Sequence, residues 1–232
     1  MKFTPPSDLT EFIVSTRYCN ASDEAVVSRA EELTRDADNT TEAALNIHTW
    51  VRDHFLFGFT PVTEKASETL KAKYGWCVTK TNLQIALLRA IGIPARFHQV
   101  SVTKKALKGL ASGSMYLTIK EPIWFHPWCE CYLEGKWITC DLWIDRFTHK
   151  AALKAGVLAP GDMTTVVWNG KDDLNLVEPW FLEDRGIRAS YDQVVDEVAA
   201  AFKSIPTGII NWLMNGSNRY TARLRKQHGQ PV

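Results

Sequence analysis

Residues 77–91 are the stretch that most constrains the fold, because the helix that they predict is apolar almost all round towards its end. Gly92 and Pro94 follow directly and end the helical pattern, since glycine is favoured just beyond a helix and proline cannot continue one. A helix this apolar needs cover from other elements, so we expect it in the centre of a core. The apolar residues that recur at helical spacing are Val78, Leu83, Ala86, Leu87 and Ala90.

The pattern is helical before this stretch and strand-like after it. Ser22, followed by two acidic residues, predicts a capped helix that runs to about Asp36, and a second helix is expected from about Thr41. After the central helix the residues alternate as they do in strands, with Glu134-Gly135 as a hairpin turn. The expected strands are Ala95 to Thr103, Met115 to Ile119, Trp124 to Leu133 and Lys136 to Asp145. Helices first and antiparallel strands afterwards predict an α+β fold.

The chain has 232 residues, which is enough for one sizeable hydrophobic core. We expect a single domain over residues 1–232, with its core at about 40–145 and a mostly helical C-terminal extension at about 147–232. Helices are expected in the extension from Tyr191 to Lys203 and from Ile209 to Met214. The basic end, from Arg219 to Lys226, is expected to be solvated or frayed.

The composition excludes several classes of partner. A hydrophobic fraction of 45%, a charged fraction of 23% and a net charge of +1 are typical of a soluble globular protein. They predict neither a nucleic-acid nor a membrane partner. The first eight residues lack the apolar segment of a signal peptide, and no long uncharged apolar run follows. Five cysteines in a chain of this size favour reduced thiols and a cytoplasmic protein, and we expect no cofactor and no metal.

Cys77 is the first candidate catalytic residue because it stands at the start of the central helix. Unpaired backbone N–H groups and the positive end of the helix dipole favour a thiolate at that position. A histidine beside such a thiol can take its proton, and a carboxylate can hold the imidazole in the required tautomer. A lone cysteine in a helix is more often a small buried residue than a nucleophile, so the assignment needs partners.

His126 and Asp141 are the candidate partners. Alternation along the strand from Trp124 to Leu133 places His126, Trp128, Glu130 and Tyr132 on one side, and the intervening cysteines on the other. A hairpin at Glu134-Gly135 brings Asp141 roughly opposite His126 and Trp128. The nine tryptophans are numerous for this length. We expect those near the proposed site to contact substrate, namely Trp76, Trp124, Trp128 and Trp143.

The residues around these candidates resemble the transglutaminase-like superfamily, whose core is a papain-like cysteine-enzyme fold. The resemblance covers about residues 40 to 145. It lies in His48-Thr49-Trp50-Val51-Arg52-Asp53, in Gly75-Trp76-Cys77, in residues 82–96 with their Gly-Ile-Pro-Ala-Arg ending, in residues 126–137 with their His-x-Trp-x-Glu-x-Tyr pattern, and in Asp141. It implies N-terminal helices packed on an antiparallel sheet, with the nucleophile at a helix N-terminus.

For function, the resemblance implies Cys77 as nucleophile, His126 as base and Asp141 as the acid that orients it. The implied reaction is acyl transfer through a thioester, which cleaves or forms an amide, ester or thioester bond. The partner would be a small-molecule or peptide acyl substrate, with water or an amine as acceptor. Two positions depart from the family's pattern: Trp76 stands where an acidic or polar residue is frequent, and Leu142 where proline is frequent. Trp76 could thereby reshape the acyl pocket.

Three alternatives compete with this interpretation. Cys129, Cys131 and Cys140 could meet on the other face of the hairpin and hold zinc, although no second paired motif accompanies them. Calcium dependence is not expected, because no loop carries the dense acidic run that a calcium site needs. The same fold could also serve as a non-catalytic binding or scaffolding module. An unreactive, buried Cys77 would favour that third alternative.

Overall fold

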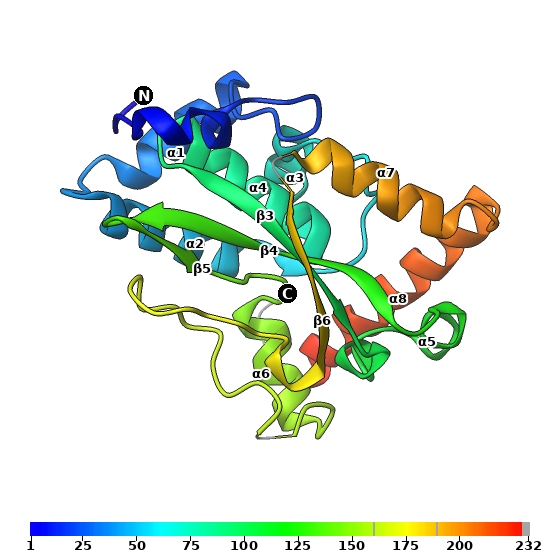
Figure 1. The fold of residues 1–232 in the computed structure, drawn as a ribbon. Helices are drawn as coiled ribbons and strands as arrows, with labels where there is room; N and C mark the ends of the chain where they lie inside the picture. Colours follow the sequence, from blue (N-terminus) through cyan, green and yellow to red (C-terminus); the bar gives the residue numbers. More distant parts are fainter. Residues whose placement is uncertain (160, 189, 229–232) are drawn as a thin grey trace.

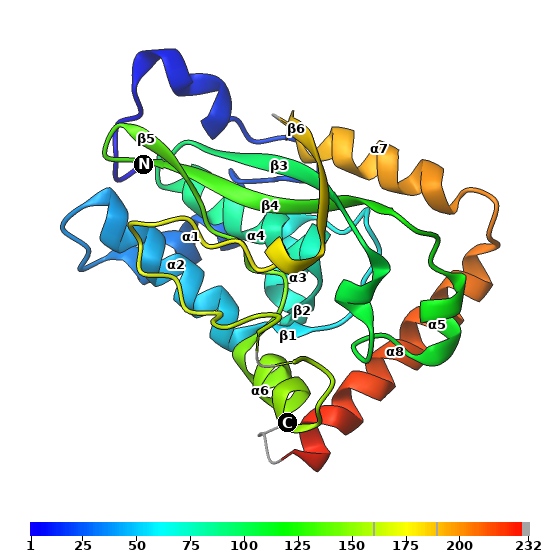
Figure 2. The same ribbon diagram turned by 60° about the horizontal axis from the view of Figure 1, so that its bottom comes forward.

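The computed structural model describes residues 1–159, 161–188 and 190–228. Its first part is helical: a short 3-10 helix, η1 (Ser7–Ile13), precedes α1 (Glu24–Thr34), α2 (Thr40–His54), α3 (Ala66–Ala72) and α4 (Cys77–Ala90). The predicted central helix is confirmed, since every residue of α4 from Cys77 to Arg89 is buried. Figure 2 shows the sheet lying across α4, with α1 and α2 on the same side of the sheet as α4.

The main sheet has the strand order β5-β4-β3-β6, and each neighbouring pair is antiparallel. It contains β3 (Ala95–Val102), β4 (Ile123–Leu133), β5 (Lys136–Thr139) and β6 (Phe181–Arg188). The first two strands were predicted, and the predicted turn at Glu134-Gly135 joins β4 to β5. The expected α+β fold, with helices packed on an antiparallel sheet, is confirmed (Figure 1).

Two strand predictions are wrong in part or in whole. The strand expected from Met115 to Ile119 is a helix, α5 (Gly113–Thr118), because the Ser112 side chain accepts a hydrogen bond from the Met115 N–H and caps it. The strand expected from Lys136 to Asp145 ends at Thr139. Beyond it the backbone turns to pair with residue 174, where Cys140 and Leu174 form an isolated parallel bridge.

The C-terminal extension is mostly helical, as expected, but it is also part of the main sheet. It holds α6 (Arg146–Lys154), η3 (Glu178–Trp180), α7 (Tyr191–Phe202) and α8 (Thr207–Gln227), and it also contributes β6 to the main sheet. The expectation of a solvated or frayed end at Arg219 to Lys226 is wrong in part: this stretch belongs to α8, where Thr221 and Arg225 are buried, while Arg219, Arg223 and Lys226 are exposed. Arg225 donates hydrogen bonds to Phe57 O and to the Thr148 hydroxyl, which ties α8 to α6.

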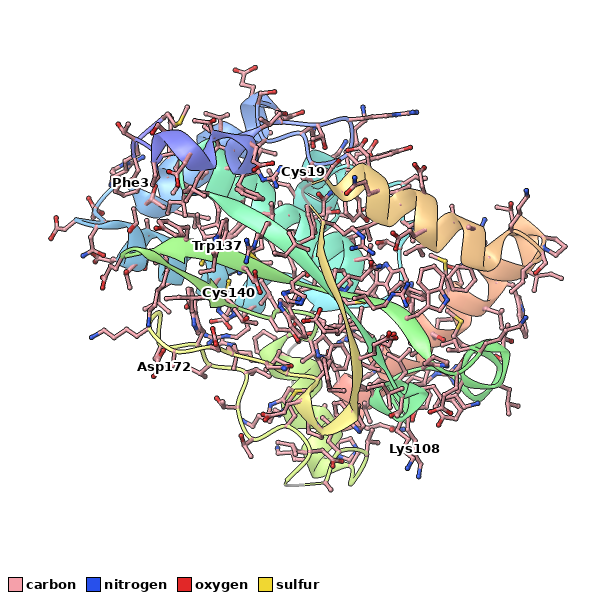
Figure 3. The ribbon with its side chains drawn as sticks, viewed as in Figure 1. Phe3, Cys19, Lys108, Trp137, Cys140 and Asp172 are labelled. Atoms are coloured by element: carbon pink, nitrogen blue, oxygen red, sulfur yellow. The ribbon has the colours of Figure 1, made fainter. Side chains whose placement is uncertain are left out.

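Side chains fill the space between α4 and the sheet, where Cys140 is fully buried, whereas Lys108 and Asp172 are exposed (Figure 3). Near the centre, a two-stranded parallel sheet pairs β1 (Leu56–Phe57) with β2 (Tyr74–Gly75). Between β3 and β4 the chain forms η2 (Lys104–Leu107) and then α5. Among the described residues there is no helix whose length and apolarity would allow it to cross a membrane.

Candidate active site

Cys77 is positioned by the pairing of β1 with β2 immediately before α4. The Gly58 N–H donates to Gly75 O at 2.9 Å, which fixes the chain two residues before the helix begins. Gly75 is required there, because a Cβ atom would come within 2.8 Å of the Thr79 hydroxyl oxygen. The Trp76 N–H donates to that same hydroxyl oxygen. Cys77 is therefore held as the first residue of α4, as the sequence predicted.

Asp141 follows the end of β5 and is buried completely. Its carboxylate accepts hydrogen bonds from the backbone N–H groups of Leu142 at 2.7 Å and of Leu176 at 3.3 Å. Its backbone oxygen is 3.3 Å from Nε2 of His48, on α2. Burial lowers the pKa of His48 to about 3, so this imidazole is neutral and donates from Nε2 to that oxygen. The Asp141 backbone is thus held by α2, and its side chain is fixed by Leu142 and by Leu176 of the C-terminal extension.

His126, on β4, meets Asp141 as predicted. Its Nε2 is 3.4 Å from Oδ2 of Asp141, and its ring lies edge to face with Trp143 at a centroid distance of 6.3 Å. Within the described chain, Nδ1 of His126 has no hydrogen-bond partner. Nε2 therefore points to the carboxylate, and Nδ1 is the nitrogen that is available to a thiol.

Cys77 and His126 line one small pocket of about 40 Å³. That volume admits about three water molecules. Cys77 is 9% exposed and His126 is 5% exposed, so solvent barely reaches either. No hydrogen bond joins the Cys77 sulfur to His126 among the described residues. The nucleophile and base proposed from the sequence thus line one small pocket. The proposed acid, Asp141, does not line it and is joined to it through its contact with His126.

The thiol of Cys77 differs from expectation in its acidity. Burial raises its pKa, and the negative charge of Asp141 raises it further. Hydrogen bonds from the backbone N–H groups of Cys77 and Val78 lower the pKa, as a helix N-terminus should, but burial outweighs them. The expectation of a thiolate favoured by the helix start is therefore wrong for this closed arrangement. The sulfur is a neutral thiol until a base takes its proton.

Two of the four predicted substrate-binding tryptophans line this pocket. Trp76 packs against Phe59 and Phe125, and Trp143 packs against Phe57 and His126. Trp124 lines a separate depression beside α5. Trp128 stacks on His98 with a centroid distance of 5.0 Å and is not among the lining residues of the pocket.

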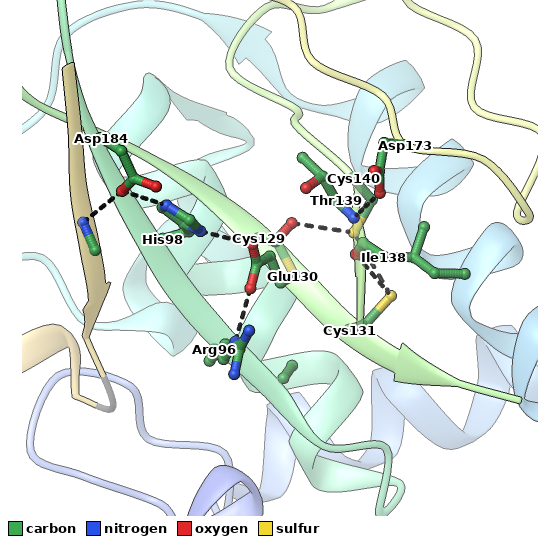
Figure 4. Close-up of polar contacts among 12 residues, drawn as sticks. Arg96, His98, Cys129, Glu130, Cys131, Ile138, Thr139, Cys140, Asp173 and Asp184 are labelled. Atoms are coloured by element: carbon green, nitrogen blue, oxygen red, sulfur yellow. Dashed lines mark hydrogen bonds and ion pairs between the residues drawn. The ribbon is translucent and has the colours of Figure 1, made fainter. Parts of the chain in front are cut away.

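His98, on which Trp128 stacks, belongs to a polar network that joins three strands (Figure 4). His98, on β3, contacts Glu130 at 2.6 Å and Asp184, on β6, at 2.7 Å, and Arg96 pairs with Glu130 at 2.7 Å. Burial alone would lower the pKa of His98, but its hydrogen bonds to both carboxylates, and their charges, together raise it. The predicted polar face of β4 is therefore divided: Glu130 helps to hold β6 on the sheet through His98, Trp128 packs on the same histidine, and His126 lines the pocket.

The three cysteines of the hairpin do not form a metal site. All three are fully buried, and the sulfur atoms of Cys131 and Cys140 are 3.7 Å apart. The Gln84 amide nitrogen lies 3.2 Å from the Cys140 sulfur, where it is a donor and not a metal ligand. No group of three or more histidine, cysteine or acidic side chains in the described part of the chain could hold a metal ion. The zinc alternative has no support in this geometry.

Lys80 is a buried amine that sequence reasoning did not single out. It lies one helical turn after Cys77 and is completely buried, and its Nζ atom has no hydrogen-bond partner among the described residues. Burial lowers its pKa from 10.5 to about 8, although the charges of Asp145 and Asp141 act in the opposite direction. The amine thus places a positive charge near the carboxylate that contacts His126.

This burial predicts a pH-dependent stability. The unfolded chain binds the Lys80 proton up to about pH 10.5, whereas the folded chain releases it near pH 8, so stability rises with pH between these values. Relative to Lys80→Met, the wild-type free energy of unfolding should rise by about 3 kcal/mol across that window. Urea unfolding at several pH values measures the difference. The exposed Lys71→Met is the control and should run parallel to the wild type; a parallel course for Lys80→Met would contradict the assignment.

Comparison with known proteins identifies one family. The family model described as the transglutaminase-like superfamily matches residues 27–142. No curated protein sequence matches the chain.

Three solved structures are similar over part of their length. A proposed cysteine protease from Cytophaga hutchinsonii is 25% identical, with a TM-score of 0.47 over 59% of this chain and 42% of that one. A proposed protease from Parabacteroides distasonis is 14% identical, with a TM-score of 0.38 over 57% of this chain and 25% of that one. Red sea bream transglutaminase is 18% identical, with a TM-score of 0.32 over 51% of this chain and 24% of that one. The chain thus spans less than half the length of each.

Proposed function

This chain belongs to the transglutaminase-like superfamily, and from that premise we propose that it is a cysteine-dependent acyl-transfer enzyme. The observation that carries the proposal is the position of Cys77 and His126 in one pocket, with His126 Nε2 3.4 Å from Asp141 Oδ2. This arrangement supports Cys77 as nucleophile, His126 as general base and acid, and Asp141 as the group that orients the imidazole. We also propose that the whole chain is one domain, because β6 and Leu176 complete its sheet and its site.

In the proposed first step, Nδ1 of His126 takes the proton of Cys77 while the sulfur attacks an acyl carbonyl. A carbon–sulfur bond forms, and the bond to the leaving group breaks as His126 returns the proton to that group. In the second step, water or an amine gives its proton to His126 and attacks the thioester, and the proton then returns to the Cys77 sulfur. The raised pKa of Cys77 supports proton transfer coupled to attack, because the buried thiol does not ionise by itself.

Two donors are proposed for the oxyanion that develops during attack. One is the backbone N–H of Cys77 at the start of α4, and the other is the indole N–H of Trp143. Trp143 is 2% exposed and lines the pocket, and its Nε1 has no hydrogen-bond partner among the described residues. A buried donor without a partner costs free energy, and a substrate oxyanion would satisfy it.

Trp143→Phe tests the second donor. The variant keeps most of the aromatic packing against Phe57 but removes the N–H, so we expect kcat to fall about 100-fold with little change in KM. Steady-state kinetics on a thioester substrate measures both constants. Trp128→Phe is the control: it also removes a buried indole N–H without a partner, but outside the pocket. An equal loss in the two variants would contradict a role for Trp143 as donor.

Thiol reactivity tests the proposal itself. With iodoacetamide under native conditions, Cys77 should be alkylated before the other four cysteines, which are fully buried. His126→Ala should slow that reaction at neutral pH and shift its profile to higher pH, because the base that takes the thiol proton is gone. Mass spectrometry of the digested protein assigns the modified residue.

The non-catalytic alternative has one observation in its favour, which is the burial of Cys77. It predicts that Cys77 reacts no faster than Cys19, a fully buried thiol whose pKa burial raises to about 11. It also predicts that His126→Ala has no effect. Either result would replace the proposed enzyme with a binding module.

A further inference from the structure

The pocket around Cys77 and His126 is lined almost entirely by hydrocarbon and aromatic side chains. Apart from these two residues and the indoles of Trp76 and Trp143, the described lining carries no polar side-chain group. η2 contributes Leu107 to it and α5 contributes Met115. An acyl group attached to the Cys77 sulfur would be surrounded by these side chains.

A larger groove adjoins this pocket. It has a volume of about 360 Å³ and lies between residues 59–63 and the α7–α8 segment of the C-terminal extension. The groove and the pocket share four lining residues, Phe59, Trp76, Met115 and Phe202. Lys203 is the one charged side chain among the described residues that line the groove. In Figure 1, α5, which contributes Met115 to both cavities, lies beside α8.

The wall between groove and pocket has a fixed part and a displaceable part. The indole N–H of Trp76 donates to Thr60 O, and the Asn218 side chain bonds both the N–H and the C=O of Phe59, at 2.8 and 2.9 Å. Phe202 is held by no such bond: it ends α7, is partly exposed, and meets Phe125 edge to face at 5.8 Å. Phe202 is therefore the side chain that can turn aside when substrate enters.

From this continuity we propose that the enzyme takes an uncharged, apolar acyl group, which passes from the groove past Phe202 into the pocket at Cys77. The proposal rests on the proposed function and names its substrate class. The resting pocket of about 40 Å³ is too small for a hydrocarbon chain, so Phe202 moves to admit one. A charged acyl group is excluded from the pocket at Cys77, because the side chains that line this pocket offer no opposite charge and few polar groups to replace its hydration.

A series of acyl thioesters of N-acetylcysteamine tests the substrate class. From acetyl through butyryl and hexanoyl to octanoyl, kcat/KM should rise about fourfold for each methylene group until the cavity is filled. The adipoyl thioester places a carboxylate where the hexanoyl chain has a methyl group, and its kcat/KM should be at least about 100-fold lower. A flat series, or equal rates for hexanoyl and adipoyl, would overturn the proposal.

Phe202→Ala tests the path. It should raise kcat/KM for the octanoyl relative to the butyryl thioester about tenfold, because the displaceable part of the wall is gone. The control is Trp212→Ala on α8, since Trp212 is 61% exposed and lines neither cavity; it should leave the ratio unchanged. An unchanged ratio in Phe202→Ala would place the acyl group elsewhere.

Thioester binding to the Cys77→Ala variant tests the apolar pocket independently of the proposed catalytic function. Isothermal titration of this variant should give at least tenfold tighter binding of the hexanoyl than of the adipoyl thioester. Such binding, without thioester formation in the wild type, would support the pocket and contradict the proposed function. Thioester formation without chain preference would support the function and contradict the pocket. Equal or absent binding of both compounds to Cys77→Ala would overturn the pocket.

Discussion

Cys77→Ala is expected to lower kcat by about 10⁴-fold or more on any acyl substrate that the wild type turns over. The sulfur is the atom that forms the thioester, and no other cysteine lines the pocket among the described residues. The loss should not follow from unfolding, because alanine keeps the helix start and removes a single buried heavy atom. Steady-state turnover and the thermal midpoint, measured on the same preparation, separate the two effects.

Cys129→Ala is the matched control for this experiment. Cys129 is buried completely but lies on β4, outside the pocket. Its replacement should reduce stability by an amount similar to that of Cys77→Ala and leave kcat unchanged. A Cys77→Ala variant that retains turnover, or a Cys129→Ala variant that loses it, would contradict the assignment of the nucleophile.

Asp141→Asn is expected to have the next largest effect, with kcat reduced by about 10³-fold. The carboxylate oxygen that faces His126 Nε2 also accepts from the Leu176 N–H, while the other oxygen accepts from Leu142. The NH₂ group of an asparagine must replace one of these two oxygens. In one position it faces the Leu142 N–H, which is also a donor. In the other it faces the Leu176 N–H and His126, where it favours the wrong tautomer of the imidazole. The imidazole then presents N–H at Nδ1, where the proposed mechanism needs an acceptor.

A structural control makes this prediction specific. Asp145→Asn alters a second buried carboxylate, which caps α6 through Phe147 and Thr148. It should reduce the thermal midpoint with a much smaller effect on kcat. Equal losses of kcat in the two variants would show that Asp141 acts through stability and not through His126.

The residues that organise the core could be predicted from the sequence. A helix that is apolar almost all round towards its end is expected inside a core, and α4 is buried from Cys77 to Arg89. The Glu134-Gly135 turn sets the hairpin, whose pairing runs as far as Glu130 opposite Thr139, and Asp141 lies two residues beyond that ladder. His126 and Asp141 meet as expected, although the Leu176 N–H, from outside the hairpin, also holds the Asp141 carboxylate.

Other features depend on contacts that no local pattern carries. β6 is an exposed edge strand whose sequence shows no apolar alternation, and it is held by backbone pairing with β3 and by the His98–Asp184 contact. The acidity of Cys77 depends on how completely distant segments cover it, so its raised pKa could not be inferred from a helix start. The burial of Lys80 has the same origin. The residues next to Cys77 and Lys80 in the sequence do not show that these two side chains are buried.

The most direct test of the catalytic assignment is the location of a trapped acyl group. The wild type is mixed with hexanoyl-N-acetylcysteamine and quenched in acid within the first turnover, and its peptides are analysed by mass spectrometry. The proposal predicts a hexanoyl adduct on the peptide that contains Cys77, and no adduct in Cys77→Ala. Turnover of this substrate with the acyl group on another residue, or with no covalent adduct at any quench time, would contradict it.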